Sequence, residues 1–310
     1  VEGNEGKRTY EHDQPFDELD RLIQQYKAPH LAGLPRFHGG AVGYAAYDAI
    51  RYIEHLPNAP KDDRNIPDLS FAFFDQMVVF DNIRKVVLVV ALAHTGTGDA
   101  KVSYQTACER VDAMVELLRR PKQDLLPVDI DTTTPAMPAR IESNFTKEKF
   151  IESVEKCKEY IRAGDFFQIV ISQRFETETT ASPLEIYRSL RVVNPSPFMV
   201  YLKDPNCTLV ASSPEIMVRV ENGKIVSRPL AGTRRRGVND EEDRRLAADL
   251  LADPKERAEH IMLVDLGRND VGRVSKFNTV RLDDVMTVEK YSHVMHITSN
   301  VTGELAPGLT

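Results

Sequence analysis

The sequence predicts an α+β fold, and three observations lead to this prediction. Apolar runs rich in Val, Ile and Phe come in pairs separated by short turn sequences, which indicates antiparallel hairpins. Other segments repeat apolar residues at helical spacing, which indicates amphipathic helices packed on a core. The chain has 310 residues, 42% of them hydrophobic and 28% charged, so it suits two globular domains or one large one.

Composition argues against several classes of function. The net charge of -7 argues against a nucleic-acid partner, because phosphates require a basic face. No apolar run approaches the roughly 20 residues of a membrane span, and the polar opening "VEGNEGKRTY" contains no signal peptide. Cys108, Cys157 and Cys207 are scattered, so they predict neither a disulfide framework nor a metal cluster. We therefore expect a cytoplasmic protein with no membrane or nucleic-acid partner.

The first predicted domain covers residues 1–120 and mixes strands with helices. Its segment "GGAVGYAAYDAIRY" begins Gly-rich and ends with helix-compatible spacing. The runs "LSFAFFDQMVVF" and "KVVLVVALAH" predict strands on either side of a turn at "DNIR". A helix is predicted at residues 100–120, with an apolar face formed by Val111, Met114, Val115 and Leu118. The Pro- and Thr-rich residues 121–143 then predict a linker.

The second predicted domain covers residues 144–310. It begins with a helix from Lys147 to Ala163, which Thr146 caps and Gly164 ends. The run "FFQIVISQRF" predicts a strand buried on both faces for most of its length. Asn222-Gly223, between alternating runs, predicts a two-residue hairpin turn. The other predicted elements are a helix at 183–193, strands at "FMVYL" and "CTLVAS", helices at 240–252 and 254–270, and one or two strands in "TVRLDDVMTVEKYSHVMHITSNVTGEL".

The segment "RPLAGTRRRG", at residues 228–237, combines a Pro and two Gly residues with four cations. We expect a loop that leaves the hairpin at Pro229 and enters a helix near Asp240. Asn239 can cap that helix, and Glu242 would complete a capping box. The acids of the first turn suit the helix dipole and can pair with the three consecutive arginines. Because these acids crowd the helix end and no nucleotide fingerprint is present, a phosphate site is not predicted.

Four residues beside these elements are candidates for ligand or metal contact. Gly232 lets the backbone approach a ligand closely, and Thr233 adds a hydroxyl. Glu256 and Glu259 lie three positions apart, so their carboxylates share one helix face. They would suit Mg²⁺, which takes one or two carboxylates plus waters. The alternative, which spacing alone favours, is that Glu256 only caps the helix and Glu259 pairs with a Lys or Arg.

The segment "SHVMHI" contains two histidines, His293 and His296. In a strand, their odd spacing places them on opposite faces, so they would not share one ion. One of them could face a pocket as a proton donor near neutral pH. The alternative is a packed histidine with satisfied hydrogen bonds. Spacing and composition therefore indicate candidate sites without identifying a reaction.

Long segments along nearly the whole chain resemble component I of anthranilate synthase, within the family of chorismate-utilising enzymes. These segments are "GGAVGYAAYDAIRYIEHLP", "IRAGDFFQIVISQRF", "NPSPFMVYL", "SSPEIM", "RPLAGTRRRG", "ERAEHIMLVDLGRNDVGRVS" and "YSHVMHITSNVTGEL". Their order along the chain follows the order in the family. The resemblance implies large mixed, mainly antiparallel sheets in two layers, with helices packed outside.

The resemblance also implies a reaction. Ammonia attacks the chorismate ring, the ring hydroxyl leaves, and pyruvate is eliminated to give anthranilate. Glu259 is implied as a Mg²⁺ ligand with Glu256 in the outer coordination sphere, and His296 as the residue that assists hydroxyl departure. A cation between protein carboxylates and a dianionic substrate is physically coherent. The other implied pocket residues are Ala231, Gly232 and Thr233 as chorismate contacts, and Glu215 of "SSPE" as a further catalytic candidate.

The motif "NPSPFM" resembles the tryptophan feedback site of the family. Asn194, Ser196, Pro197, Phe198 and Met199 are implied in binding the inhibitor. The family more often has Tyr where Phe198 stands. A Pro-fixed turn into a strand is the structural alternative, and both interpretations can hold together.

Three rival functions remain to be weighed. Component I of aminodeoxychorismate synthase resembles this chain but has a nucleophilic Lys where Ala231 stands, and Ala cannot attack. Isochorismate and salicylate synthases use a Lys base where Gln168 stands, and Gln cannot serve as a base. A truncated non-catalytic relative that senses tryptophan or docks a partner is the third, and the presence of Glu256, Glu259 and His296 argues against it.

The family normally obtains ammonia from a glutaminase partner. No Cys-His glutaminase signature is evident in this sequence, so we expect a separate glutamine amidotransferase subunit, component II. The family also has a further segment before and after the stretch matched here. We therefore expect these 310 residues alone to be an incomplete enzyme.

Overall fold

The structure is a computed structural model, and it describes residues 2–3, 6–7, 9, 11–96, 98–120, 130 and 140–309. The chain divides into two compact units, Val1–Val128 with Leu202–Cys207, and Asp129–Tyr201 with Thr208–Thr310. Most of the predicted linker, at 121–129 and 131–139, lies outside the described residues, so the predicted domain boundaries stay predictions. Within the described ranges, no helix has the length and apolar character needed to cross a bilayer.

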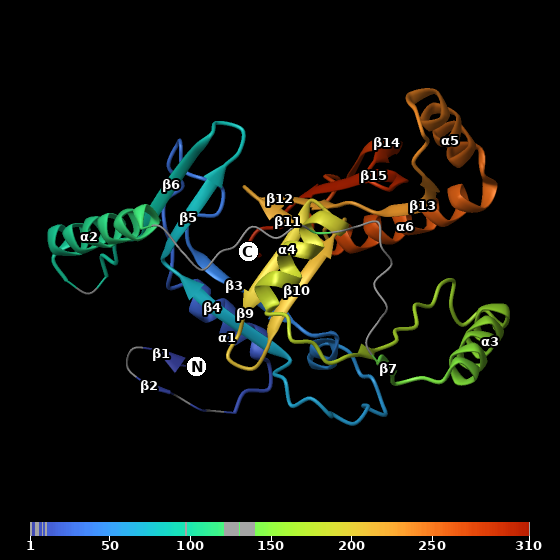
Figure 1. Cartoon of the computed structure of the whole chain (residues 1–310), viewed down its shortest axis with the longest axis horizontal. Coiled ribbons are helices and arrows are strands. Elements are labelled where there is room, and N and C mark those ends of the chain that lie inside the picture. Colours follow the sequence, from blue (N-terminus) through green and yellow to red (C-terminus); the bar gives the residue numbers. More distant parts are fainter. Residues whose placement is uncertain are drawn as a thin grey trace. The chain divides into compact units, whose positions relative to one another are not determined.

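The first unit is built from antiparallel hairpins and helices (Figure 1). The β5–β6 hairpin confirms the predicted turn at "DNIR", because Asp81 pairs with Val86. The predicted helix is confirmed as α2, whose N-cap Asp99 accepts a hydrogen bond from the Lys101 N–H. Its elements are β1 (Glu2–Gly3), β2 (Gly6–Lys7), α1 (Pro15–Ile23), β3 (Gly40–Ala45), the 3₁₀ helix η1 (Tyr47–Tyr52), β4 (Leu69–Phe74), β5 (Gln76–Asp81), β6 (Val86–Ala91) and α2 (Ala100–Arg119).

The second unit contains the largest described sheet, which is built around the long strand β15. β14 pairs along one edge of β15, while β13 and then β12 pair along its other edge. β11 pairs with β12 through the predicted hairpin, in which Asn222 and Gly223 have φ angles of 52° and 72°. The strands are β11 (Arg219–Glu221), β12 (Lys224–Ser227), β13 (Leu230–Arg235), β14 (Arg281–Lys290) and β15 (Val294–Glu304).

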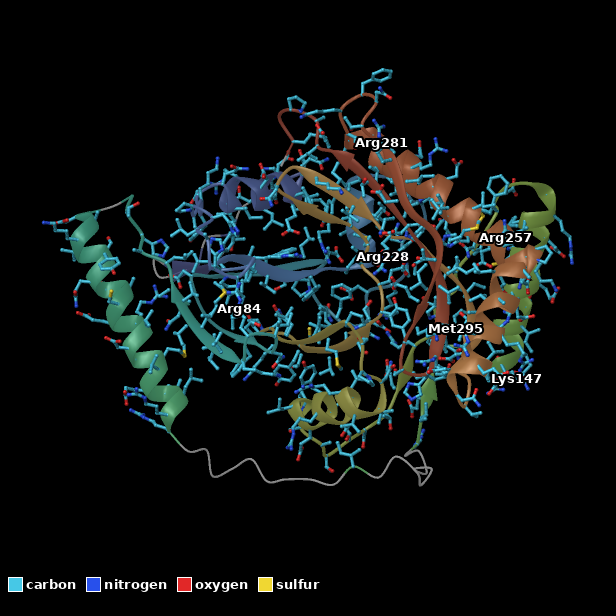
Figure 2. All side chains as sticks on the ribbon, turned by 90° about the horizontal axis from the view of Figure 1, so that it is seen from above. Arg84, Lys147, Arg228, Arg257, Arg281 and Met295 are labelled. Carbon is cyan, nitrogen blue, oxygen red and sulfur yellow. The ribbon has the colours of Figure 1, made fainter. Side chains whose placement is uncertain are left out.

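Side chains of β15 alternate between a helix-covered face and an open face. Met295 and Ile297 pack on Leu250 of α5 (Asp240–Ala252), and all three are fully buried. Figure 2 labels Met295, which lies on β15. Val301 packs in a second cluster with Val264 of α6 (Pro254–Val274), and Figure 1 shows α6 running along the sheet. The intervening residues, which include His296, Asn300 and Thr302, therefore belong to the other face.

The remaining elements of the second unit are mostly as predicted. α3 spans the predicted residues, with Thr146 as N-cap and Gly164 in the left-handed conformation at its end. Ser182 and Glu185 form a complete capping box at the start of α4. These elements are β7 (Glu142–Ser143), α3 (Lys147–Ala163), β8 (Phe175–Glu176), α4 (Pro183–Val193), β9 (Phe198–Lys203) and β10 (Thr208–Ser213).

Two predictions about strands and loops in the second unit were wrong. The run "FFQIVISQRF" forms a strand only at its end, where β8 begins at Phe175, and the preceding residues are irregular. Phe167 is 91% exposed and Val170 is 87% exposed, so the run is not buried on both faces. The predicted loop "RPLAGTRRRG" instead contains the strand β13, because β15 supplies a partner along this edge.

Candidate active site

A two-residue bulge interrupts β13. The ladder with β15 is regular up to Ala231 and resumes at Arg234, so Gly232 and Thr233 both stand opposite His296. Gly232 has a φ angle of 66°, a left-handed conformation that residues with a side chain rarely adopt. This conformation explains why a glycine occupies the position. The bulge directs the carbonyl group of Gly232 toward His296 of β15.

The imidazole of His296 is held by this bulge. Its Nδ1 lies 2.8 Å from the carbonyl oxygen of Gly232 and 3.2 Å from the hydroxyl of Thr233. A carbonyl oxygen can only accept a hydrogen bond, so Nδ1 must carry the hydrogen. The hydrogen bonds of His296 in the described part of the chain all involve Nδ1, so Nε2 is the nitrogen left to exchange a proton with a ligand. His293 lies outside β15, exposed, and its ring bonds to Ser292.

Glu256 lies on the other side of the same glycine. A Cβ atom added to Gly232 would be 3.2 Å from the Glu256 Oε2. Asp253 caps α6 through the backbone N–H groups of Lys255 and Glu256, and Pro254 is the first helical residue. The Glu256 side chain is 18% exposed. The helix start therefore fixes a half-buried carboxylate against the bulge.

Glu259 lies one turn further along α6, on the same helix face as Glu256. Its Oε1 accepts a hydrogen bond of 3.4 Å from the amide of Gln168, and no Lys or Arg pairs with it among the described residues. The only cation near Glu256 in the described ranges is Arg234, whose Nη1 is 3.9 Å away and which Asp249 and Asp253 already neutralise.

The chemistry of this donor set fits a hard divalent cation. Half-buried carboxylates such as those of Glu256 and Glu259 are the kind of group that Mg²⁺ takes, with waters or a substrate completing the shell. No group of three or more His, Cys, Asp or Glu side chains able to hold a metal occurs among the described residues. Glu256 and Glu259 are two carboxylates, and one or two carboxylates plus waters is the usual protein contribution to a Mg²⁺ site.

Glu215 follows β10 and lies near the same histidine. The Ser213 hydroxyl fixes the backbone of Glu215. It accepts a hydrogen bond from the Glu215 N–H and donates one to the Glu215 carbonyl. Burial of its carboxyl group raises the pKa of Glu215, while the Leu230 N–H and the charge of His296 act in the opposite direction. Glu215 lines a pocket of about 370 Å³ together with Arg228 and others on the open face of the sheet.

The three consecutive arginines bind acids, as predicted, but not all of them on the first turn of α5. Arg235 binds Glu242, and Arg236 binds Asp243. The Asp243 side chain is 1% exposed, and its bonds with Arg236 hold its pKa well below the usual range. Glu242 does not complete the predicted capping box, because its carboxylate reaches back to the N–H of Val238. The arginines therefore tie β13 to the helices.

The proline-containing turn lies between α4 and β9. The Ser212 hydroxyl donates to the Asn194 carbonyl at 2.7 Å and lies 2.8 Å from the Ser196 hydroxyl. Phe198 lines the pocket that contains Glu215. Met199 is the next residue of β9, so its side chain belongs to the opposite face. The structure thus brings Asn194 and Ser196 together and separates Phe198 from Met199; Pro197 is exposed in the turn.

Two polar arrangements near the site carried no signal in the sequence patterns. Arg228 binds Glu289 of β14, which in turn accepts from the Tyr291 hydroxyl. On the covered face, His260 of α6 is fully buried and bonds to the Ser299 hydroxyl at 2.7 Å. The contacts of Arg228 and Tyr291 with Glu289 depend on the register of β14 against β15, which places Glu289 opposite His296. Only this register could have indicated them.

Known proteins resemble this chain in sequence over most of its length. The sequence model of the family described as "chorismate binding enzyme" matches residues 1–310. Anthranilate synthase component 1 of Acetivibrio thermocellus is 45% identical over 296 residues, covering 94% of this chain and 59% of that protein. The chloroplastic anthranilate synthase alpha subunit 1 of Arabidopsis thaliana is 50% identical over 285 residues, covering 88% and 47%. The chain thus spans about half the length of the curated relatives it matches.

Solved structures share its fold. The crystal structure of anthranilate synthase component I from Streptococcus pneumoniae TIGR4 matches with a TM-score of 0.81 and 37% identity, covering 94% of this chain and 63% of that one. The menaquinone-specific isochorismate synthase MenF of Escherichia coli matches with a TM-score of 0.50 and 14% identity, covering 94% and 59%, which speaks for the fold alone. These matches confirm the predicted α+β fold.

Proposed function

Because the chain belongs to the chorismate binding enzyme family, we propose that it is component I of an anthranilate synthase. In this proposal chorismate and ammonia give anthranilate, pyruvate and water. The observation that carries the proposal is the Gly232 bulge, which brings the Nδ1 of His296 and the carboxylate of Glu256 to one backbone position. The identity to anthranilate synthase components over most of the chain supports the choice of reaction.

His296 is proposed to protonate the departing ring hydroxyl. Nδ1 is committed to the Gly232 carbonyl, so the proton must come from Nε2. The ring C–O bond breaks with its electron pair on oxygen, which takes this proton and leaves as water. Ammonia supplies the electron pair of the new C–N bond and loses a proton. An imidazole suits this task because it exchanges protons near neutral pH.

The second step releases pyruvate and makes the ring aromatic. The C–O bond to the enolpyruvyl group breaks, a ring proton is lost, and the enolpyruvyl group takes up a proton as pyruvate. Glu215 is a candidate for handling a proton here, because burial raises its pKa and so favours a carboxyl group that can give and take protons. Gly232 and Thr233 are proposed to contact the substrate from the bulge.

Glu259 is proposed to bind Mg²⁺, with Glu256 in the outer coordination sphere. The bound ion would supply positive charge that draws the substrate's ring carboxylate toward these two acids. Within this chain, Gln168 orients Glu259, and the helix start orients Glu256.

Ala231 does not support the rival reaction of aminodeoxychorismate synthase, which uses a nucleophilic Lys at this position. This residue is 6% exposed and pairs with Ile297 within the ladder, so it offers no nucleophile to the pocket. Gln168, beside Glu259, likewise offers no base for adding water.

Regulation and partners complete the proposal. Tryptophan is proposed to bind near Asn194, Ser196, Pro197, Phe198 and Met199, and the Ser212 hydroxyl supports this idea by ordering their turn. A glutamine amidotransferase subunit is proposed as the source of ammonia, because the relatives are named as components or subunits of anthranilate synthase. The scattered cysteines are consistent with a proposed cytoplasmic location.

A product assay tests the proposed reaction. The protein, expressed from its whole gene, is given chorismate, ammonium and Mg²⁺, and the aminobenzoates are separated by liquid chromatography. We expect ortho-aminobenzoate and pyruvate in equal amounts. Formation of para-aminobenzoate or isochorismate, or no turnover of chorismate, would contradict the proposal.

A further inference from the structure

We propose that Glu289 and Tyr291 position the imidazole of His296, and that Arg228 holds them in place. We call Arg228, Glu289 and Tyr291 the Tyr291 brace. The inference rests on the proposed function, in which the Nε2 of His296 delivers a proton to the substrate. None of the three is assigned a contact with the substrate, so they are positioning residues.

The ring of His296 needs a second restraint. Its hydrogen bond to Gly232 fixes Nδ1, but the ring can still tilt about that contact. The Tyr291 ring supplies a second contact, with centroids 5.5 Å apart and an angle of 64° between the planes. This edge-to-face geometry is favoured between aromatic rings. The two contacts together define the direction of Nε2.

The Tyr291 ring is itself anchored through its hydroxyl. The hydroxyl donates a hydrogen bond of 3.1 Å to the Oε2 of Glu289. The other oxygen of Glu289 is bound by the guanidinium of Arg228, so both carboxylate oxygens are engaged. Glu289 also stands directly opposite His296 in the ladder of β14 with β15, so the two side chains share one face.

The backbone under Tyr291 is fixed independently of its side chain. The Tyr291 N–H donates to the Val294 carbonyl at 2.8 Å, closing the turn between β14 and β15. The Tyr291 carbonyl accepts from Arg236 at 2.6 Å, and Arg236 is bound to the buried Asp243. Replacing the Tyr291 side chain should therefore release the imidazole without displacing the turn.

The tautomer of the His296 ring tests the brace without relying on activity. Histidine is labelled with ¹⁵N in the whole-gene protein, His296→Asn identifies the ring signals, and spectra are taken at a pH where the ring is neutral. The parent should show the hydrogen on Nδ1. Tyr291→Leu and Glu289→Gln should move both ring signals toward the average of two tautomers, and Tyr291→Phe should move them less.

A matched control removes a similar ring pair elsewhere in the unit. Tyr187 and Tyr201 also meet edge to face, at 5.8 Å. Tyr187→Leu should leave the His296 signals unchanged. Parent-like signals in both Tyr291→Leu and Glu289→Gln would overturn the brace, as would an equal change in Tyr187→Leu. If Tyr291→Leu fails to fold, Glu289→Gln and Tyr291→Phe decide the question.

Kinetics distinguish the brace from the proposed function. Loss of orientation should lower kcat about ten- to a hundredfold in Tyr291→Leu, with KM unchanged. Full activity of His296→Asn would remove the proposed role of His296, whereas the ring signals would still decide whether the brace orients it. Unchanged kcat in Tyr291→Leu, with His296→Asn inactive, would overturn the brace alone.

Discussion

The Nδ1 of His296 donates a hydrogen bond of 2.8 Å to the carbonyl oxygen of Gly232, across a break in the ladder of β13 with β15. The same glycine lies against Glu256, so that a Cβ atom there would be 3.2 Å from its carboxylate. Gly232 thus contacts both His296, the proposed proton donor, and α6, the helix that carries the proposed Mg²⁺ site. Changes at this glycine should affect both.

Gly232→Ala should destabilise the protein by about 1–3 kcal/mol. The new Cβ would occupy a left-handed backbone position and lie 3.0 Å from the buried Leu250. Gly164→Ala is the matched control, because Gly164 has a φ angle of 88° but no atom within 4 Å of an added Cβ. Urea unfolding followed by circular dichroism should show the larger loss at Gly232. Equal losses would mean that crowding by Leu250 and Glu256 contributes nothing.

Acid should weaken the fold partly through His260. Burial lowers the pKa of this histidine, whereas in the unfolded chain it titrates near 6.5. Below about pH 6.5 the unfolded chain binds a proton that the folded chain does not, so the free energy of unfolding falls as pH decreases. In His260→Gln this part of the pH dependence should be absent. Urea unfolding at about pH 7.5, 6.5 and 5.5, values on both sides of the unfolded-state pKa, measures how the free energy of unfolding changes with pH.

A substitution at the exposed His293 provides the control. His293→Gln should keep the slope of the parent between the same pH values. The interpretation fails if His260→Gln and the parent lose the same free energy over this interval. Comparing slopes, not absolute stabilities, removes the cost of replacing a buried side chain.

Glu259→Gln should weaken Mg²⁺-dependent binding of chorismate by about tenfold or more, because the proposed carboxylate ligand becomes neutral. Isothermal titration with chorismate, with and without Mg²⁺, measures this effect. Glu241→Gln, an exposed acid on the first turn of α5, should bind like the parent. Chorismate affinity that does not respond to Mg²⁺ or to EDTA in the parent would count against the metal proposal.

Ser212→Ala should raise the tryptophan concentration for half-inhibition about two- to tenfold, the effect expected for one hydrogen bond. The lost hydroxyl orders the carbonyl of Asn194 and contacts Ser196. Ser153→Ala is the control, because its hydroxyl donates to a backbone carbonyl within α3. Dose–response curves at fixed chorismate provide the measurement. A parent enzyme that tryptophan does not inhibit would remove this regulatory proposal.

Elements set by neighbouring residues could be predicted from the sequence. Thr146 and Gly164 mark the ends of α3, and Asn222-Gly223 marks the hairpin, because caps and tight turns depend on a few adjacent residues. The run "FFQIVISQRF" was predicted wrongly, because apolar composition does not show whether a partner strand lies alongside.

The sequence could indicate single residues of the site but not how they come together. Motifs named Gly232, Glu256 and His296, but their meeting at a bulge depends on the register of β13 against β15, which no local pattern encodes. Tyr291 was overlooked for the same reason, because its contact with His296 arises from the turn that joins two strands.

The central claim is that His296 donates the proton that lets the ring hydroxyl leave, and His296→Asn tests it most directly. The variant and the parent are compared for kcat with chorismate and ammonium, and for chorismate affinity by titration. The account predicts a loss of about 10²–10⁴ in kcat, the usual contribution of a general acid, with affinity within about threefold of the parent, less than one hydrogen bond is worth. A variant that forms anthranilate at the parental rate would contradict it.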